Sequence, residues 1–335
     1  MPEATAVHVP HAPDPARLDH LAEEVLKAHG TAALARSPLG DAENVTYRVD
    51  TAAGPRLLRL KPPGRLTRSH VASELNWLQA LRRDTTLRVP KPIPFPNGEL
   101  VRHFAVPGAP GLWLGTVLEW VDGEFRPDRL TESDTLQVGR LAASLHAHAE
   151  TYRLPAGFTR PRLQDDPAFQ SWAPLLASRP DLTGPERAAI NAALRVAEGA
   201  LAAASQGAVR THLLHGDLHQ GNYLFAEAAA GAIDFDDCLF GPALYDLAAT
   251  LAHLSLPDQD GSLAAAFLAG YEDVRPLRSR ERELLGAFVT LRHLWMLHWI
   301  LQRDRQPAFA QWAPEYRAWQ LGALMQAALT PRGFY

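Results

Sequence analysis

The hydrophobic periodicity changes once along this chain of 335 residues, and that change constrains the fold more than any other feature. Over 31–121, short strand-like runs alternate with one helical segment at 67–81. From about residue 129 almost to the end, apolar residues recur at helical spacing, with one polar interruption over 212–237. We therefore predict an α+β chain with a strand-rich domain over 1–121 and a larger helical domain over 122–335.

The expected elements follow from the same patterns. A helix over 15–29 carries apolar residues at the i, i+3, i+4 positions, and Gly30 is a plausible C-cap. Thr131 can cap the first helix of the second domain, and the prolines over 89–94 enforce an extended connector. Strands are expected over 44–50, 56–60, 100–106 and 112–121. Further helices are expected near 185–205, 241–254, 262–271, 279–302 and 314–328.

Composition excludes several classes of protein. Lys and Arg number 33 against 37 Asp and Glu, so a net charge of −4 lacks the basic footprint of a dedicated nucleic-acid binder. The single cysteine, Cys238, excludes an internal disulfide and a Cys-based zinc site, and it favours a reduced compartment. No signal-peptide pattern and no run of 18 apolar residues is evident. We expect a cytoplasmic protein with neither nucleic acid nor membrane as partner.

The polar interruption contains a spacing that carries chemistry. It includes H-G-D-L-H-Q-G-N, in which Asp217 precedes Asn222 by five residues, as in the kinase catalytic loop H-R-D-x-x-x-x-N. Twelve residues after Asn222, the run A-I-D-F-D-D places Asp234 at the end of an apolar segment. Phosphoryl transfer needs a carboxylate to orient the attacking hydroxyl and oxygen ligands for Mg²⁺ on the ATP phosphates. Asp217 suits the first role, and Asn222 and Asp234 suit the second.

A lone H-x-D would indicate only a solvated turn, but the combined motifs are more specific. H-G-D-L-H-x-G-N followed by I-D-F-D-D, G-P and Y-D-L-A closely resembles the aminoglycoside phosphotransferase family. That family groups antibiotic kinases with choline, homoserine and related small-molecule kinases and with a bacterial stress-response protein kinase. The resemblance covers roughly residues 35–255. It implies a bilobal, protein-kinase-like fold with ATP in the cleft.

The resemblance also implies roles for residues of the first domain. Arg59 falls where kinases place the strand lysine that contacts ATP phosphates, and Lys61, two residues on, is a rival for that role. Glu74 resembles the helix glutamate that pairs with this cation. The backbone of Glu119 and Val121 would bond adenine in the segment that joins the domains.

In the second domain, Asp246 resembles the aspartate that braces the catalytic loop, and His215 and His146 are expected to be structural. His219 remains open between a spectator, a substrate contact and a phosphate contact. Asp236 is the best candidate for an additional metal or water ligand.

Two departures from the kinase pattern narrow the function. The segment 38–44 contains one glycine in place of a glycine-rich loop, and only twelve residues separate Asp234 from Asp246, too few for a long activation loop. We expect an ATP- and Mg²⁺-dependent phosphotransferase acting on a hydroxyl of a small molecule. The alternatives are a protein Ser/Thr kinase and a nucleotide-binding pseudokinase; the intact Asp217, Asn222 and Asp234 argue against the latter.

The C-terminal region gives a weaker indication of the acceptor. Residues 281–335 hold six arginines and four acidic residues, a poor match for polycationic aminoglycosides. Five polar or aromatic residues share its main helix: Arg292, His293, Trp295, His298 and Trp299. They form either an anion-binding or aromatic acceptor pocket or part of an amphipathic core stripe, and we favour the core stripe.

Overall fold

The protein divides into two compact units. The computed structural model describes residues 14–39, 44–64, 66–166, 171–227, 229–254 and 260–329. The first unit comprises the chain up to Gly123 together with Arg153–Arg160, and the second comprises Glu124–Tyr152 and the chain from Pro161 onward. Residues 40–43 of the glycine-poor segment 38–44 lie outside the described residues.

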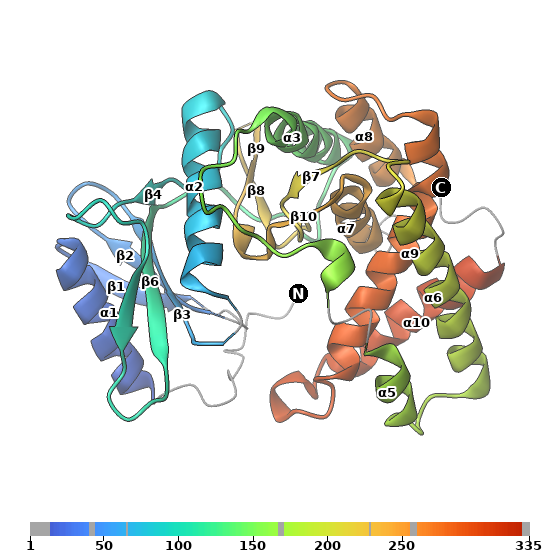
Figure 1. Cartoon of the computed structure of the whole chain (residues 1–335), viewed down its shortest axis with the longest axis horizontal. Coiled ribbons are helices and arrows are strands. Elements are labelled where there is room, and N and C mark those ends of the chain that lie inside the picture. Colours follow the sequence, from blue (N-terminus) through green and yellow to red (C-terminus); the bar gives the residue numbers. More distant parts are fainter. Residues whose placement is uncertain are drawn as a thin grey trace. The chain divides into compact units, whose positions relative to one another are not determined.

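The first unit is built on one antiparallel sheet (Figure 1). Its strand order is β1-β2-β3-β6-β4, and β5 also pairs with β6. Its strands are β1 (Ala35–Leu39), β2 (Val45–Asp50), β3 (Arg56–Lys61), β4 (Pro92–Ile93), β5 (Arg102–Ala105) and β6 (Leu112–Glu119). The sequence did not predict β1, and it predicted only an extended connector where β4 forms, because two paired residues leave no periodic signal.

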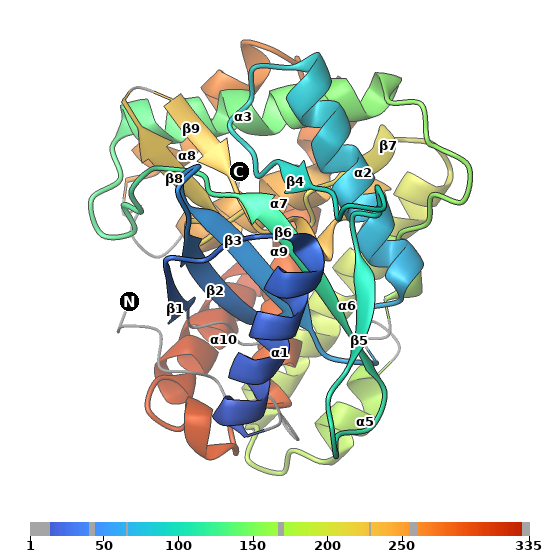
Figure 2. The same ribbon diagram turned by 90° about the vertical axis from the view of Figure 1, so that its left-hand side faces the viewer.

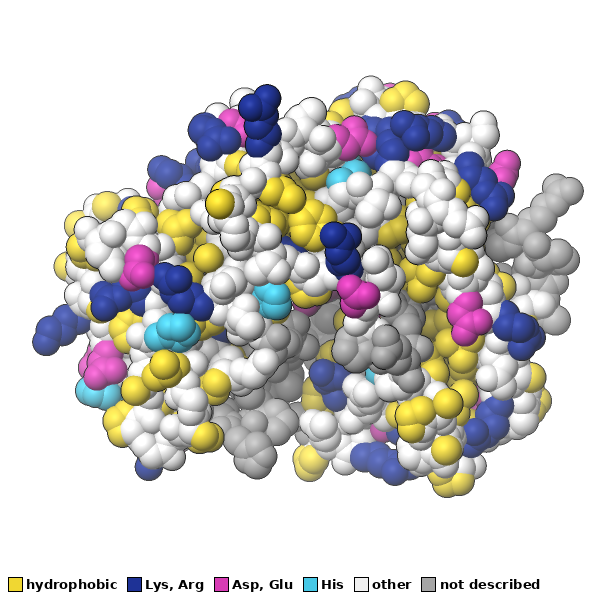
Figure 3. All heavy atoms as spheres, in the orientation of Figure 1, with side chains coloured by type: hydrophobic (Ala, Val, Ile, Leu, Met, Phe, Trp, Pro, Cys, Tyr) yellow, Lys and Arg dark blue, Asp and Glu magenta, His cyan; other side chains and the backbone are white. Residues whose placement is uncertain are grey.

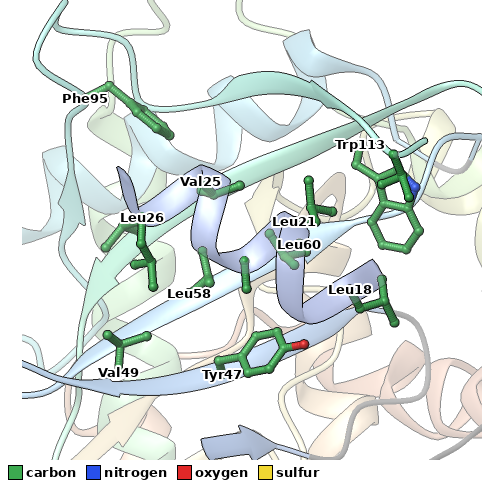
Figure 4. Packing of buried hydrophobic residues seen from close by; sticks show 13 residues of the cluster. Leu18, Leu21, Val25, Leu26, Tyr47, Val49, Leu58, Leu60, Phe95 and Trp113 are labelled. Atoms are coloured by element: carbon green, nitrogen blue, oxygen red, sulfur yellow. The ribbon is translucent and has the colours of Figure 1, made fainter. Parts of the chain in front are cut away.

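Helix α1 (Pro15–His29) covers one face of this sheet (Figure 2). The Asp14 side chain accepts from the N–H of Ala16 at 3.0 Å, and Gly30 ends the helix in the left-handed conformation, so the expected cap is confirmed. The apolar side chains of α1 face strand residues across the core, as Leu21 and Leu58 do in Figure 4. Burial of this single helical face therefore fixes α1 on the sheet.

Helix α2 (Arg68–Asp84) begins one residue after the predicted start at Thr67, which is its N-cap, and runs three residues further than expected. The returning segment 153–160 is hydrogen-bonded to it: the Thr159 N–H donates to Ser73 Oγ at 2.9 Å, and Arg160 donates to the carbonyl of His70. No pattern in the sequence predicted this return, because it depends on tertiary hydrogen bonds.

The second unit is mainly helical. Its α-helices are α3 (Glu132–Thr151), α5 (Trp172–Ala177), α6 (Gly184–Ser205), α7 (Leu244–Leu254), α8 (Ser262–Glu272), α9 (Ser279–Leu301) and α10 (Ala313–Leu329), and its 3₁₀ turns are η1 (Leu163–Asp165), η2 (Phe235–Asp237) and η3 (Pro307–Phe309). Thr131 caps α3 in a reciprocal capping box with Asp134, as expected. Helices α3 and α8 approach closely because each presents a glycine: a Cβ on Gly139 or Gly270 would lie 2.0 Å from a carbonyl oxygen of the other helix.

The polar interruption folds into two short antiparallel strand pairs. Strand β7 (Thr211–Leu214) pairs with β10 (Leu239–Pro242), and β8 (Tyr223–Ala226) pairs with β9 (Ala229–Ala232). Because β10 takes residues 239–242, α7 begins at Leu244 and not at 241 as predicted. The loop between β7 and β8 carries the H-G-D-L-H-Q-G-N motif.

Helix α9 packs against α6, α7 and α10. Over its second half nearly every side chain is buried, so the expected core packing is confirmed, and burial there extends beyond a single stripe. By length and composition, α9 could cross a membrane, but 78% of the relevant window is buried inside the protein, as is typical of a core helix.

On the face that Figure 3 shows, basic and acidic side chains are interspersed. This distribution agrees with the near-balanced composition.

Candidate active site

The loop between β7 and β8 is held by Asp246 of α7. Its Oδ2 accepts from the N–H of His215 at 2.8 Å, and its Oδ1 accepts from the N–H of Gly216 at 2.7 Å. Gly216 has φ +88°, and a Cβ there would lie 2.2 Å from the carbonyl oxygen of Asp237. The expected bracing by Asp246 is therefore present, and only glycine fits at position 216.

A chain of buried hydrogen bonds holds Asp246 in turn. Nε2 of His146 lies 3.0 Å from Oδ2 of Asp246, and Nδ1 of His146 lies 2.9 Å from the hydroxyl of Tyr271. Burial lowers the pKa of His146, so the ring is neutral and donates from Nε2 to the carboxylate. Burial raises the pKa of Asp246, but the hydrogen bond from His146 outweighs it, and the pKa is lowered overall. His146 thus has the structural role expected of it.

Both carboxylate oxygens of Asp217 are engaged. Its Oδ1 accepts from Nη2 of Arg292, and its Oδ2 accepts from Nδ2 of Asn222 at 3.2 Å. Nε2 of His219 also lies 3.2 Å from Oδ2. Because Nδ1 of His219 accepts from the N–H of Gly221 at 2.9 Å, the N–H of its ring is at Nε2 and points at Asp217.

These contacts keep Asp217 ionised. Burial raises the pKa of its carboxyl, but His219 and Arg292 outweigh burial and hold the pKa well below its usual range. The ring of His253 stacks on His219 with centroids 4.5 Å apart, and burial holds the pKa of His253 well below its ordinary value. His219 therefore contacts the carboxylate of Asp217, and the three roles that the sequence left open for it stay predictions.

Asn222 and Asp234 lie at the same end of the β8–β9 pair. The N–H of Ile233, next to Asp234, donates to the carbonyl of Asn222 at 2.9 Å. The amide nitrogen of Asn222 donates to Asp217, which leaves its oxygen as a potential metal ligand. Asp234 adopts a left-handed conformation with φ 59°, an unusual backbone geometry that is concentrated at functional sites.

This donor set has the chemistry of a divalent-metal site that is completed by phosphate. Among the described residues, no group of three His, Cys, Asp or Glu side chains could hold a metal by itself. Mg²⁺ is commonly bound by one or two carboxylates together with substrate phosphates, so an amide oxygen and a carboxylate fit it. Asp236, the further candidate ligand, is 3% exposed in η2.

The first unit brings Arg59 and Glu74 together. Nη1 of Arg59 lies 2.9 Å from Oε1 of Glu74, and both side chains are buried. Nζ of Lys61 lies 3.9 Å from Oε2 of the same carboxylate. Alternation along β3 places both cations on the face that meets α2, and Arg59 makes the closer ion pair.

Glu119 ends β6, and Val121 follows it. The N–H of Glu119 donates to the carbonyl of Lys91 at 2.8 Å, and its side chain accepts from Nζ of Lys91 at 3.2 Å. The N–H of Glu119 is therefore already engaged, and its carbonyl is the backbone group that can accept from a ligand.

Sequence reasoning placed Arg292 on α9 but missed its contact with Asp217. The guanidinium also lies over the ring of Trp295, 4.6 Å from the centroid, and donates to the hydroxyl of Tyr245 at 3.4 Å. A signal was present: an arginine among core positions of an apolar helix requires a buried acid. The sequence gives no means of choosing which acid.

A small antiparallel sheet with a buried Arg–Glu pair, and a helical unit with a braced Asp-x₄-Asn loop, together define a protein-kinase-like fold with phosphotransferase chemistry. Residues 35–284 match the model of the phosphotransferase enzyme family (APH). The chain belongs to this family, and it is a phosphotransferase.

Individual relatives and solved structures support this family assignment. The chain is 29% identical over 280 residues to a homoserine kinase of Acidiphilium cryptum, covering 78% of this chain and 80% of that protein. A solved microcompartment-associated aminopropanol kinase is 27% identical, with a TM-score of 0.77, covering 93% of this chain and 98% of the other. An amicoumacin kinase in complex with AMP-PNP, Ca²⁺ and Ami shares the fold at 18% identity, with a TM-score of 0.77 and coverage of 94% and 96%.

Proposed function

We propose that this phosphotransferase uses ATP and Mg²⁺ to phosphorylate the hydroxyl of a small amino alcohol. The observation that carries the proposal is Asp217, ionised and oriented by its neighbours and five residues before Asn222. The acceptor class is supported by the relatives: homoserine and aminopropanol each combine an amine with a hydroxyl.

Asp217 would act mainly by orienting the acceptor. Its depressed pKa makes it a weak base, and in a loose phosphoryl-transfer transition state the hydroxyl loses its proton late. A carboxylate that is always ionised and held in one orientation supplies the positioning on which this reaction depends.

Asn222 and Asp234 would hold the metal. When bound, Mg²⁺ neutralises the charge that develops on the transferred phosphoryl group. The left-handed backbone of Asp234 supports this role, since such strained geometry is concentrated at functional sites.

The first unit would bind the nucleotide. Arg59, oriented by Glu74, offers the N–H donors of a guanidinium to phosphate oxygens, and the carbonyl of Glu119 can accept from the amino group of adenine. The N–H of Val121 would donate to the same ring.

The first test is calorimetric titration of ATP, with and without Mg²⁺, into the wild type and Asp234→Ala. We expect metal-dependent binding that the variant loses. Binding of neither ATP nor GTP would refute the nucleotide site.

Acceptors are then screened with homoserine and aminopropanol first and protein substrates second, using Asp217→Asn as the inactive reference. This variant should retain ATP binding and lose turnover by about 10³-fold or more. Phosphorylation of protein alone would favour the Ser/Thr kinase alternative, and wild-type turnover by Asp217→Asn would refute the mechanism.

A pair of variants identifies the phosphate-binding cation. Arg59→Ala should raise the KM for ATP more than Lys61→Ala, because Arg59 makes the closer ion pair with Glu74. The opposite order would assign the role to Lys61.

A further inference from the structure

Arg292 is the cation that α9 brings to the loop between β7 and β8. It lies in the buried half of the helix, only 2% exposed, and its guanidinium contacts Oδ1 of Asp217. The ring of Trp295 covers one face of the guanidinium at 4.6 Å and restricts its orientation. Arg292 is therefore held by packing as well as by charge.

The hydrogen bonds distinguish the two oxygens of Asp217. An ionised carboxylate oxygen accepts about two hydrogen bonds. Among the residues that the structure describes, Oδ2 faces two donors, Nε2 of His219 and Nδ2 of Asn222, whereas Oδ1 faces one, the guanidinium of Arg292. An incoming hydroxyl can therefore be accepted by Oδ1, the oxygen that Arg292 holds.

We propose that Arg292 is the positioning residue of Asp217. It holds the carboxylate in place and orients Oδ1 toward the acceptor hydroxyl. This inference rests on the proposed function, and it assigns to α9 a part in the reaction that neither the loop motif nor the metal ligands supply.

The test measures kcat and the KM for ATP in the wild type, Arg292→Gln and Arg292→Lys. Arg292→Gln should lower kcat by about 100-fold, as expected for a misplaced reacting group, and leave the KM for ATP unchanged. Arg292→Lys should also lower kcat, because an ammonium lacks the planar geometry of a guanidinium.

Arg303→Gln is the matched control, because Arg303 also lies over a tryptophan, 4.7 Å from the ring centroid of Trp299. It should change neither kcat nor the KM for ATP. Wild-type kcat in Arg292→Gln or in Arg292→Lys would overturn the proposal and leave the proposed function intact. A wild type that binds ATP but phosphorylates no acceptor would instead refute the proposed function.

Discussion

Asp246→Asn tests how much the hydrogen bonds that Asp246 accepts from the loop between β7 and β8 contribute to stability and turnover. Three donors meet this carboxylate: the N–H groups of His215 and Gly216 and the Nε2–H of His146. The amide of asparagine is nearly isosteric, but it has one acceptor oxygen. With that oxygen facing His215 and His146, the NH₂ group must face the N–H of Gly216.

The expected cost follows from these contacts. A hydrogen bond to a charged group contributes about 1.5–3 kcal/mol, and a buried N–H left without an acceptor costs about 1–3 kcal/mol. Asp246→Asn should therefore destabilise the second unit by about 4 kcal/mol. For a unit of this size the melting temperature would fall by roughly 10 °C.

The assay is thermal unfolding followed by circular dichroism, with kcat measured well below the transition. Asp273→Asn is the matched control, because its ion pair with Arg140 is about half exposed, and such pairs contribute about 0–1 kcal/mol. We expect kcat to fall in Asp246→Asn alone, since the brace sets the backbone just before Asp217. A melting temperature within 2 °C of the wild type, which is less than about 1 kcal/mol, would refute this reasoning.

Two further predictions concern the second unit. Gly216→Ala should lower both the melting temperature and kcat, because its Cβ would meet the carbonyl of Asp237. Gly30→Ala is the control for the cost of a positive φ alone, since Gly30 has a similar φ but open space around it. Equal losses of melting temperature in the two variants would contradict the clash at position 216. Burial raises the pKa of Glu281, but hydrogen bonds from Arg210 outweigh burial and lower the pKa to about 2. The ionised carboxylate therefore stabilises the fold above pH 4.5, and this contribution is lost as the pH falls toward 2. In acid-unfolding curves Glu281→Gln should remove a contribution of about 3 kcal/mol from this interval, and a curve parallel to the wild type would contradict the assignment.

The local elements were predictable because their signals are local. The caps at Thr67 and Thr131 and the left-handed Gly30 mark helix ends through bonds within a few residues. Strand β1 and the two-residue β4 escaped prediction because their partners, β2 and β6, supply the hydrogen bonds that define them. The helix predicted from 241 began later for the same reason, since β10 pairs with the distant β7.

The sequence by itself determined the chemistry of this protein. The spacing of Asp217, Asn222 and Asp234 indicated phosphoryl transfer, because those residue types at those intervals serve few other reactions. It also paired Glu74 with a cation of β3 but left Arg59 and Lys61 as rivals, which the distances of 2.9 and 3.9 Å now rank.

Only the tertiary structure decided what surrounds the reacting carboxylate. Arg292 lies 75 residues from Asp217 along the chain, on a helix whose pattern predicted a core stripe. A buried charge requires a partner, but periodicity cannot say which of the acids in the chain will meet it. The packing of α9 against α7 makes that choice, because it brings Arg292 and the loop held by Asp246 to the same place.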